Sequence, residues 1–243
     1  MILTLLALAL APGIAIAFFM YSRDQYDREP LRNLVISFLL GVLSTFPAIF
    51  LQTWLQPVLD QWLSPYSISY YAVLAFGLVA FSEEGSKYLM LRTYAYPHRD
   101  FNEPFDGIIY SVMVSMGFAT FENIWYVLEH GIATGFIRMF LAVPAHAAFG
   151  VLMGYHAGLA KFDPLNAHKR LWTGLLLAVL FHGAYDFFLF LQNNPNVTRY
   201  VSAGLLVTAS VLCWSVAMRL AYRSIRLHEA LSKQVFENSK NIL

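Results

Sequence analysis

Long apolar runs, each about 20 residues long, constrain most strongly what this sequence can fold into. An α-helix needs about that length to cross the hydrocarbon core of a bilayer, where only helices and closed barrels satisfy all their backbone hydrogen bonds. Short polar segments with proline or several charges separate the runs. The pattern therefore predicts an all-α, polytopic transmembrane helix bundle.

We expect about seven spanning helices. Their approximate ranges are 3–21, 34–55, 70–90, 105–128, 135–160, 171–191 and 200–222. The composition agrees with a lipid environment, because 58% of the residues are apolar and only 13% are charged, against about 25% charged in a soluble domain. We expect one integral membrane domain over residues 1–243, with residues 223–243 as a tail and the lipid bilayer as its surroundings.

The distribution of Lys and Arg predicts the orientation of the bundle. Cations in short loops are retained on the cytoplasmic side of a membrane. They are concentrated after the first, third, fifth and last expected spans, whereas the alternate loops hold only Arg138 and Arg199. We therefore expect the N-terminus outside and the tail in the cytoplasm. The net charge of +1 gives no indication of nucleic-acid binding.

A small set of polar and ionisable residues lies inside the expected spans, where each one needs a partner or a function. The set comprises Glu83, Glu84, Lys87, Asp106, Glu122, Asn123, His146, His156, His182 and Asp186. His156 lies close to a span end, and we interpret it as structural.

Helical spacing pairs several of these side chains. Glu83 and Lys87 are one turn apart on the same helix face, so they can form an ion pair, while Glu84 points about 100° away and is left free for chemistry or a metal. The alternative is that all three only lock the helix into the bundle. His182 and Asp186 have the same spacing, so Asp186 can orient the imidazole.

Depth along the helices suggests which residues can meet. With a rise of about 1.5 Å per residue, the side chains of Glu83, His146 and His182 come close to the bilayer midplane. Glu122 comes closer to the outer surface, so either its helix is long and tilted or the site opens outward. Gly150, Gly154 and Gly158 form a ridge of small residues that favours close helix packing.

Carboxylates and imidazoles together supply what hydrolysis of an amide needs, namely a base for water and groups that polarise a carbonyl. The motifs of several competing mechanisms are missing from the sequence: H-E-x-x-H of zinc proteases, G-x-G-D of intramembrane aspartyl proteases and G-x-S-x-G of serine hydrolases. A proton-coupled transporter and a non-catalytic scaffold of the same fold stay open as alternatives.

Four motifs in order carry a resemblance to a known family. They are E-E-x-x-K at 83–87, G-F-A-T-F-E-N at 117–123, A-H-A-A-F-G at 145–150 and F-H-x-x-Y-D at 181–186. Together they resemble the PrsW family, which is related to the type II CAAX prenyl endopeptidases of the CPBP superfamily. The resemblance implies a catalytic four-helix core over residues 70–191. It also implies a bacterial inner-membrane protease of glutamate or metallo type, whose substrate is a membrane-anchored protein such as an anti-sigma factor.

The expected catalytic residues are Glu83, Glu84, Glu122, His146, His182 and Asp186, with Lys87 and Asn123 in support. We expect Glu83, assisted by Glu84, to activate water. Zn²⁺ held by Glu122, His146 and His182 is one alternative, and a metal-free glutamate enzyme is the other. Glu122 stands where the CAAX enzymes have a histidine, so it can be a metal ligand or an accessory acid. The sequence names neither the substrate nor the oligomeric state.

Overall fold

The computed structural model describes residues 2–240, and at Ile2 and Ser239 the backbone alone. The described residues are helical or loop and contain no strand, which confirms the predicted all-α membrane bundle. Six helical stretches are long and apolar enough to cross a membrane, and the α6–α7 pair counts as one of them. They are Leu3–Arg23, Leu31–Trp62, Pro104–His130, Ile132–Lys161, Ala167–Asn193 and Ala203–Asn238.

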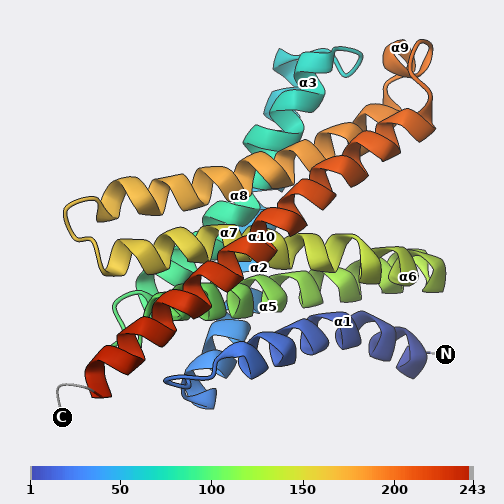
Figure 1. The fold of residues 1–243 in the computed structure, drawn as a ribbon. Helices are drawn as coiled ribbons and strands as arrows, with labels where there is room; N and C mark the ends of the chain where they lie inside the picture. Colours follow the sequence, from blue (N-terminus) through green and yellow to red (C-terminus); the bar gives the residue numbers. More distant parts are fainter. Residues whose placement is uncertain (1, 241–243) are drawn as a thin grey trace.

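Figure 1 shows the order of the helices along the chain. Their bounds are α1 Ile2–Arg23, α2 Leu31–Trp62, α3 Ile68–Ala72, η1 Val73–Ala80, α4 Phe81–Met90, η2 Leu91–Ala95, α5 Pro104–His130, α6 Ile132–Phe140, α7 Ala142–Lys161, α8 Ala167–Phe190, η3 Leu191–Asn193, α9 Pro195–Thr198 and α10 Ala203–Lys240.

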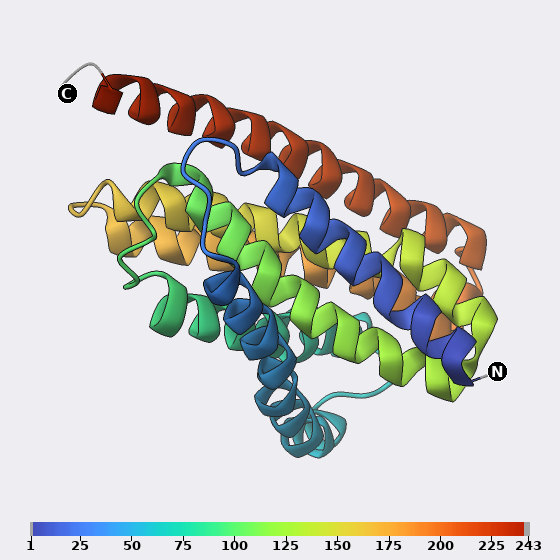
Figure 2. The same ribbon diagram turned by 90° about the horizontal axis from the view of Figure 1, so that it is seen from below.

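Helix α5 is the centre of the bundle. Of the 18 residues in its most apolar stretch, 94% are buried inside the protein, because α1, α2 and α7 all pack against this helix. Helix α8 packs on the other side of α7, and α10 crosses both of them (Figures 1 and 2). Because other helices surround α5, its buried apolar residues lie all around the helix rather than on one face.

The third expected span, 70–90, lies within a continuous helix from Ile68 to Ala95, made of α3, η1, α4 and η2. Its low hydropathy comes from Glu83, Glu84 and Lys87, all of them buried in α4. Wide π-helical turns precede and follow α4, over the eight residues of η1 and the five of η2. Such turns are rare and are found mostly near functional sites. They flank the one helix of the core that carries two adjacent acids.

Close contact between α5 and α7 depends on glycine. A Cβ atom on Gly154 would lie 2.3 Å from the backbone oxygen of Gly107, and one on Gly158 would lie 2.2 Å from that of Pro104. The expected small-residue ridge therefore faces α5, and it brings the two backbones close enough for their side chains to share one site.

The tail is part of a long helix, because α10 extends without a break to Lys240. Ser224, His228 and Ser232 are buried along one face of it, and Arg23 of α1 forms an ion pair with Glu229 at 2.6 Å. The last three residues of the expected tail, 241–243, lie outside the described part of the chain.

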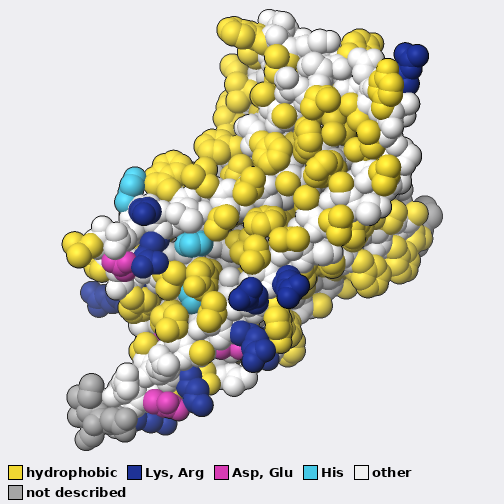
Figure 3. Space-filling view, turned by 45° about the horizontal axis from the view of Figure 1, so that its top comes forward, with side chains coloured by type: hydrophobic (Ala, Val, Ile, Leu, Met, Phe, Trp, Pro, Cys, Tyr) yellow, Lys and Arg dark blue, Asp and Glu magenta, His cyan; other side chains and the backbone are white. Residues whose placement is uncertain are grey.

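The surface matches a protein surrounded by lipid. Large apolar side chains are exposed along the helices, among them Phe18, Phe46, Leu180 and Leu212. Figure 3 shows this apolar surface in yellow, with most of the visible Lys and Arg side chains toward the end where the C-terminus lies.

Candidate active site

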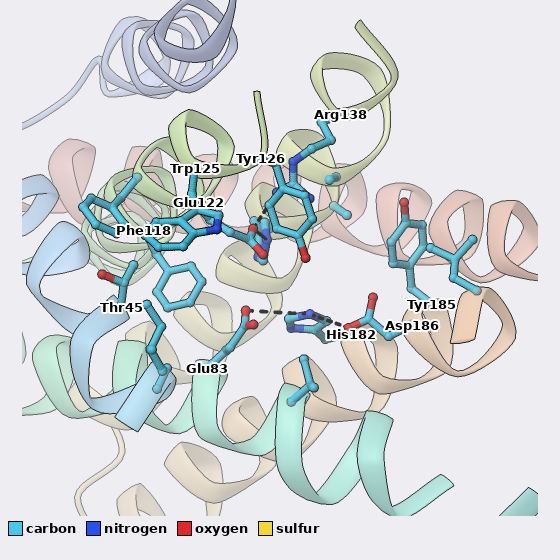
Figure 4. Close-up of a pocket in the computed structure, with 18 of the residues that line it drawn as sticks. Thr45, Glu83, Phe118, Glu122, Trp125, Tyr126, Arg138, His182, Tyr185 and Asp186 are labelled. Atoms are coloured by element: carbon cyan, nitrogen blue, oxygen red, sulfur yellow. Dashed lines mark hydrogen bonds and ion pairs between the residues drawn. The ribbon is translucent and has the colours of Figure 1, made fainter. Parts of the chain in front are cut away.

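A cavity of about 830 Å³ lies between α2, α4, α5, α6, α7 and α8. Its apolar wall includes Phe46, Ile49, Phe121 and Ile137. Its polar wall is formed by Glu83, Glu122, Arg138, His146, His182 and Asp186. Figure 4 shows the side chains of Glu83, His182 and Asp186 in a row and Glu122 beside Arg138 across the cavity. The structure thus brings the predicted catalytic acids and histidines of four helices, except Glu84, to one cavity.

The adjacent acids of α4 have different surroundings. Glu84 is completely buried and accepts a hydrogen bond from Lys87 Nζ at 2.7 Å, whereas the shortest distance from Lys87 Nζ to Glu83 is 3.8 Å. We predicted that Lys87 would pair with Glu83 and leave Glu84 free. The structure shows the closer contact with Glu84, three residues before Lys87, rather than with Glu83, four residues before it. Glu83 lines the cavity, and its Oε2 atom is buried without a hydrogen-bond partner.

His182 is held from both sides by carboxylates. Its Nδ1 lies 2.8 Å from Glu84 Oε1, and its Nε2 lies 3.2 Å from Asp186 Oδ2 and 3.9 Å from Glu83 Oε2. Since a carboxylate only accepts, Nδ1 carries a proton, and the opposite nitrogen, Nε2, faces both Asp186 and Glu83. The ring also stacks on Phe149, with centroids 5.1 Å apart.

His146 links the two sides of the site. Its Nδ1 lies 3.0 Å from Lys87 Nζ and its Nε2 lies 3.0 Å from Glu122 Oε2. The lysine ammonium donates and the glutamate accepts, so this geometry suits a neutral imidazole with its proton on Nε2. Glu122 therefore reaches the site although its depth placed it toward the outer surface.

Arg138 was not among the predicted site residues. Its Nη2 donates to Glu122 Oε2 at 2.6 Å and its Nε to Asn123 Oδ1 at 3.0 Å. Asn123 in turn donates to the backbone oxygen of Ala9 at 3.0 Å. Arg138 lies in α6. It could have been noticed in the sequence because the segments expected on the outer side contain few other cations.

Gln52 of α2 is a second cavity residue that was not predicted from the sequence. Its side-chain amide donates to Ser82 Oγ at 3.0 Å and to Glu83 Oε1 at 3.4 Å. Its signal was a polar side chain within an apolar run. Asp106 and His156, in contrast, lie away from this cavity, which neither of them lines.

Among the described residues, Glu83, His146 and His182 offer ligand atoms within 4.8 Å of one another, and all three are buried. One carboxylate and two imidazoles are a common donor set for Zn²⁺, and the unpartnered Oε2 of Glu83 lies among them. The residues therefore fit a metal ion, provided that one nitrogen of His146 and the Nε2 of His182 exchange their present partners. Glu122, the predicted third ligand, is already engaged by Arg138 and His146.

Comparison with known proteins gives a family match over most of the chain. Residues 29–216 match the family described as "PrsW family intramembrane metalloprotease". No solved structure matches the chain.

Several proteins named "Protease PrsW" are similar in sequence. The one from Bacillus subtilis is 40% identical over 192 residues, which cover 78% of this chain and 84% of that protein. Those from Geobacillus kaustophilus and Halalkalibacterium halodurans are 39% and 38% identical, with coverage of 76% and 89% of this chain and 80% and 94% of the relatives. The similarity thus extends well beyond the four motifs.

Proposed function

Because the chain belongs to the PrsW family of intramembrane metalloproteases, we propose that it cuts a membrane-anchored protein at the buried Glu83–His146–His182 site. Membership of a protease family favours hydrolysis over the transporter and scaffold alternatives. The observation that carries the proposal is Glu83 Oε2, which accepts no hydrogen bond and lies beside two histidines at the wall of a large cavity.

In this proposal Glu83 is the group that takes up the proton of the attacking water. A base must lie within hydrogen-bonding reach of the proton that it removes, and Glu83 is the cavity-lining acid with a free oxygen. Glu83 then returns the proton to the leaving amine. His146 and His182 hold the water and the scissile carbonyl in place beside it.

The other polar residues are positioning residues. Glu84 does not line the cavity but fixes Lys87 and the Nδ1–H of His182. Asp186 holds the opposite side of the His182 ring. Arg138 and Asn123 fix Glu122, which orients His146. Ring orientation set by such partners affects catalysis because small displacements of reacting groups are costly.

A zinc ion would be held by Glu83, His146 and His182. When bound, Zn²⁺ supplies Lewis-acid polarisation of a carbonyl and of water. With Glu83 as a ligand, the side chains left to accept a proton at the cavity wall are Asp186 and Glu122. The two versions of the mechanism therefore differ in the role of Glu83.

The cavity suits a peptide segment that enters from the membrane. Its apolar wall, which includes Phe46, Ile49, Phe121 and Ile137, can bury apolar side chains of a substrate. The resemblance to the PrsW family points to an anti-sigma factor with a single span as the substrate class. We further propose the orientation expected from the cations, with the N-terminus outside.

The experiment is cleavage of a single-span reporter by the purified chain in liposomes. We expect Glu83→Gln and His146→Ala to abolish cleavage while the protein keeps its unfolding temperature. Glu237→Gln, which changes an exposed acid near the end of α10 and away from the cavity, should cut normally. Retained cleavage in either site variant would refute the proposal. Zinc content, measured with a chelator-treated control, assigns the role of Glu83: the Gln variant loses the ion if Glu83 is a ligand and keeps it if Glu83 is the base.

A further inference from the structure

A second cluster of acids lies far from the candidate active site. Asp24 and Glu29 belong to the connection between α1 and α2, Glu103 caps the N-terminus of α5, and Asp106 lies in its first turn. All four are buried, with exposed fractions of 0%, 3%, 2% and 0%. Asp106 and Glu122 are separated by 16 residues of α5, or about 24 Å along the helix axis, so this cluster is not part of the catalytic cavity.

Three of these acids have one oxygen in use and one without a partner. Asp24 Oδ2 accepts from the Glu29 amide at 2.8 Å, and Asp106 Oδ2 accepts from the amides of Asn102 and Glu103 at 2.8 and 2.7 Å. The Tyr110 hydroxyl donates to Glu29 Oε2. The other oxygens, Asp24 Oδ1, Glu29 Oε1 and Asp106 Oδ1, are buried and have no hydrogen-bond partner.

Protein cations do not neutralise the cluster. Among the described residues, no ion pair joins Lys or Arg to any of the four acids. Arg28 donates to the backbone oxygen of Asp24, and Lys161 donates to the backbone oxygens of Tyr96 and His98. A buried carboxylate oxygen that meets neither a cation nor a hydrogen-bond donor is unfavourable.

Burial also disfavours the charged forms of Glu29 and Glu103, two acids of the cluster that lie outside the membrane-spanning helices. Burial, with a smaller contribution from repulsion by Asp24, raises the pKa of Glu29 to about 8. The same two causes raise the pKa of Glu103 to about 7. A cation among these groups would remove the mutual repulsion.

We propose that Asp24, Glu103 and Asp106 bind a divalent cation of the oxygen-preferring class, Mg²⁺ or Ca²⁺, at the end of the bundle where α5 begins. One ligand atom from each residue lies within 4.8 Å of the others, and the donors are all oxygens, as these cations require. Glu29 and backbone carbonyls can complete the shell.

Such an ion would join two parts of the chain. Asp24 and Glu29 fix the α1–α2 connection, and Glu103 and Asp106 fix the start of α5. The adjacent Phe105 amide donates to Ser232 Oγ of α10 at 3.1 Å, so the site also lies next to the tail helix. The ion is structural in this proposal, and its loss would loosen this end of the bundle without altering the catalytic side chains.

The test is equilibrium binding of radioactive Ca²⁺ to the purified full chain in detergent, with Mg²⁺ as competitor. We expect one ion per chain, lost in Asp106→Asn and in Asp24→Asn. Asp106→Asn keeps an oxygen to accept from the two backbone amides. Two matched controls, Asp163→Asn in an exposed loop and His146→Ala in the catalytic cavity, should bind as the unchanged chain does. Equal binding in all variants, or none in the unchanged chain, would overturn the proposal.

A variant could also lose Ca²⁺ binding because it is misfolded. Thermal unfolding of the unchanged chain and of Asp106→Asn tests the proposal in that case. After chelation the unchanged chain should be less stable than Asp106→Asn, because the variant removes one repelling charge. Added Ca²⁺ or Mg²⁺ should raise the unfolding temperature of the unchanged chain but not that of the variant. If neither cation shifts the unchanged chain and its infrared spectrum shows a protonated carboxyl that Asp106→Asn removes, the cluster holds protons and the cation site is refuted.

Discussion

At the scale of single residues, Lys87 determines how the buried acids of α4 are used. Its ammonium contacts Glu84, His146 and the face of the Phe118 ring, which lies 4.1 Å away. A lysine that is almost completely buried keeps its charge only with such partners. By engaging Glu84 rather than Glu83, it leaves one acid for structure and the other at the cavity.

Removal of Glu84 should therefore destabilise the protein more than removal of Glu83. We expect Glu84→Gln to lower the free energy of unfolding by about 3–5 kcal/mol, the usual cost of breaking a buried pair, because Lys87 loses its closest partner. Denaturation in mixed micelles measures it. The double variant Glu84→Gln with Lys87→Met should lose less than the sum of the two single variants. Additive losses would show that the pair is not coupled.

From the sequence we predicted which residues would lie in the same site, but not which of them would form ion pairs or hydrogen bonds with one another. Spacing placed Lys87 near both acids, but the choice between i,i+3 and i,i+4 partners depends on His182, which reaches Glu84 from another helix. Arg138 was missed for a related reason. Its position in α6 depends on the bend between α6 and α7 at Leu141, which no local pattern specifies.

At the scale of helices, the α5–α7 contact controls the distance between Glu122 and His146. Gly107 on α5 and Gly154 on α7 meet backbone to backbone at this crossing. Helices that lack a hydrophobic driving force in lipid rely on such close contact. The same contact holds the first turn of α7, where His146 lies, against the middle of α5.

A single methyl group at this crossing should be costly. Gly154→Ala would place a Cβ atom 2.3 Å from a backbone oxygen that cannot move aside, so we expect the free energy of unfolding to fall by about 1–3 kcal/mol and cleavage to weaken. The matched control is Gly77→Ala, whose Cβ atom would meet only the Val73 side chain at 3.7 Å. A Gly154→Ala protein as stable as the control would contradict this account of the crossing.

At the scale of the whole molecule, charge is distributed unevenly between the two ends of the bundle. The end with the C-terminus carries most of the Lys and Arg side chains seen in Figure 3, and the other end carries α9 and the α2–α3 connection. Retention of cations on the cytoplasmic side predicts which end faces inward.

Cysteine labelling in sealed, right-side-out vesicles measures the orientation. In a Cys213→Ala background, we expect an impermeant thiol reagent to label Ser64→Cys, between α2 and α3. We expect Leu165→Cys, between α7 and α8, to be labelled only after the vesicles are opened. Leu165 is 97% exposed, so access to the thiol itself is not limiting. The reverse labelling pattern would invert the orientation.

The six long apolar helices were predictable from hydropathy, because lipid imposes a length on every span. Depth along the helices also predicted that Glu83, His146 and His182 would come close to one another. The acid cluster at the start of α5 was not predicted, because Asp24 and Glu29 lie outside the spans and resemble ordinary loop acids. Only the packing of that loop against α5 shows that they are buried.

The wide turns before and after α4 have a consequence for insertions and deletions. Each π-helical stretch holds more residues per turn than an α-helix would, so removing one residue from η1 allows the chain to tighten without breaking the helix. Because the tightened turn takes up the missing residue, Glu83 should keep its direction toward the cavity. Single-residue deletions in Val73–Ala80 should therefore leave more activity than single-residue deletions within Phe81–Met90, where the loss of one residue rotates the side chains that follow by about 100°.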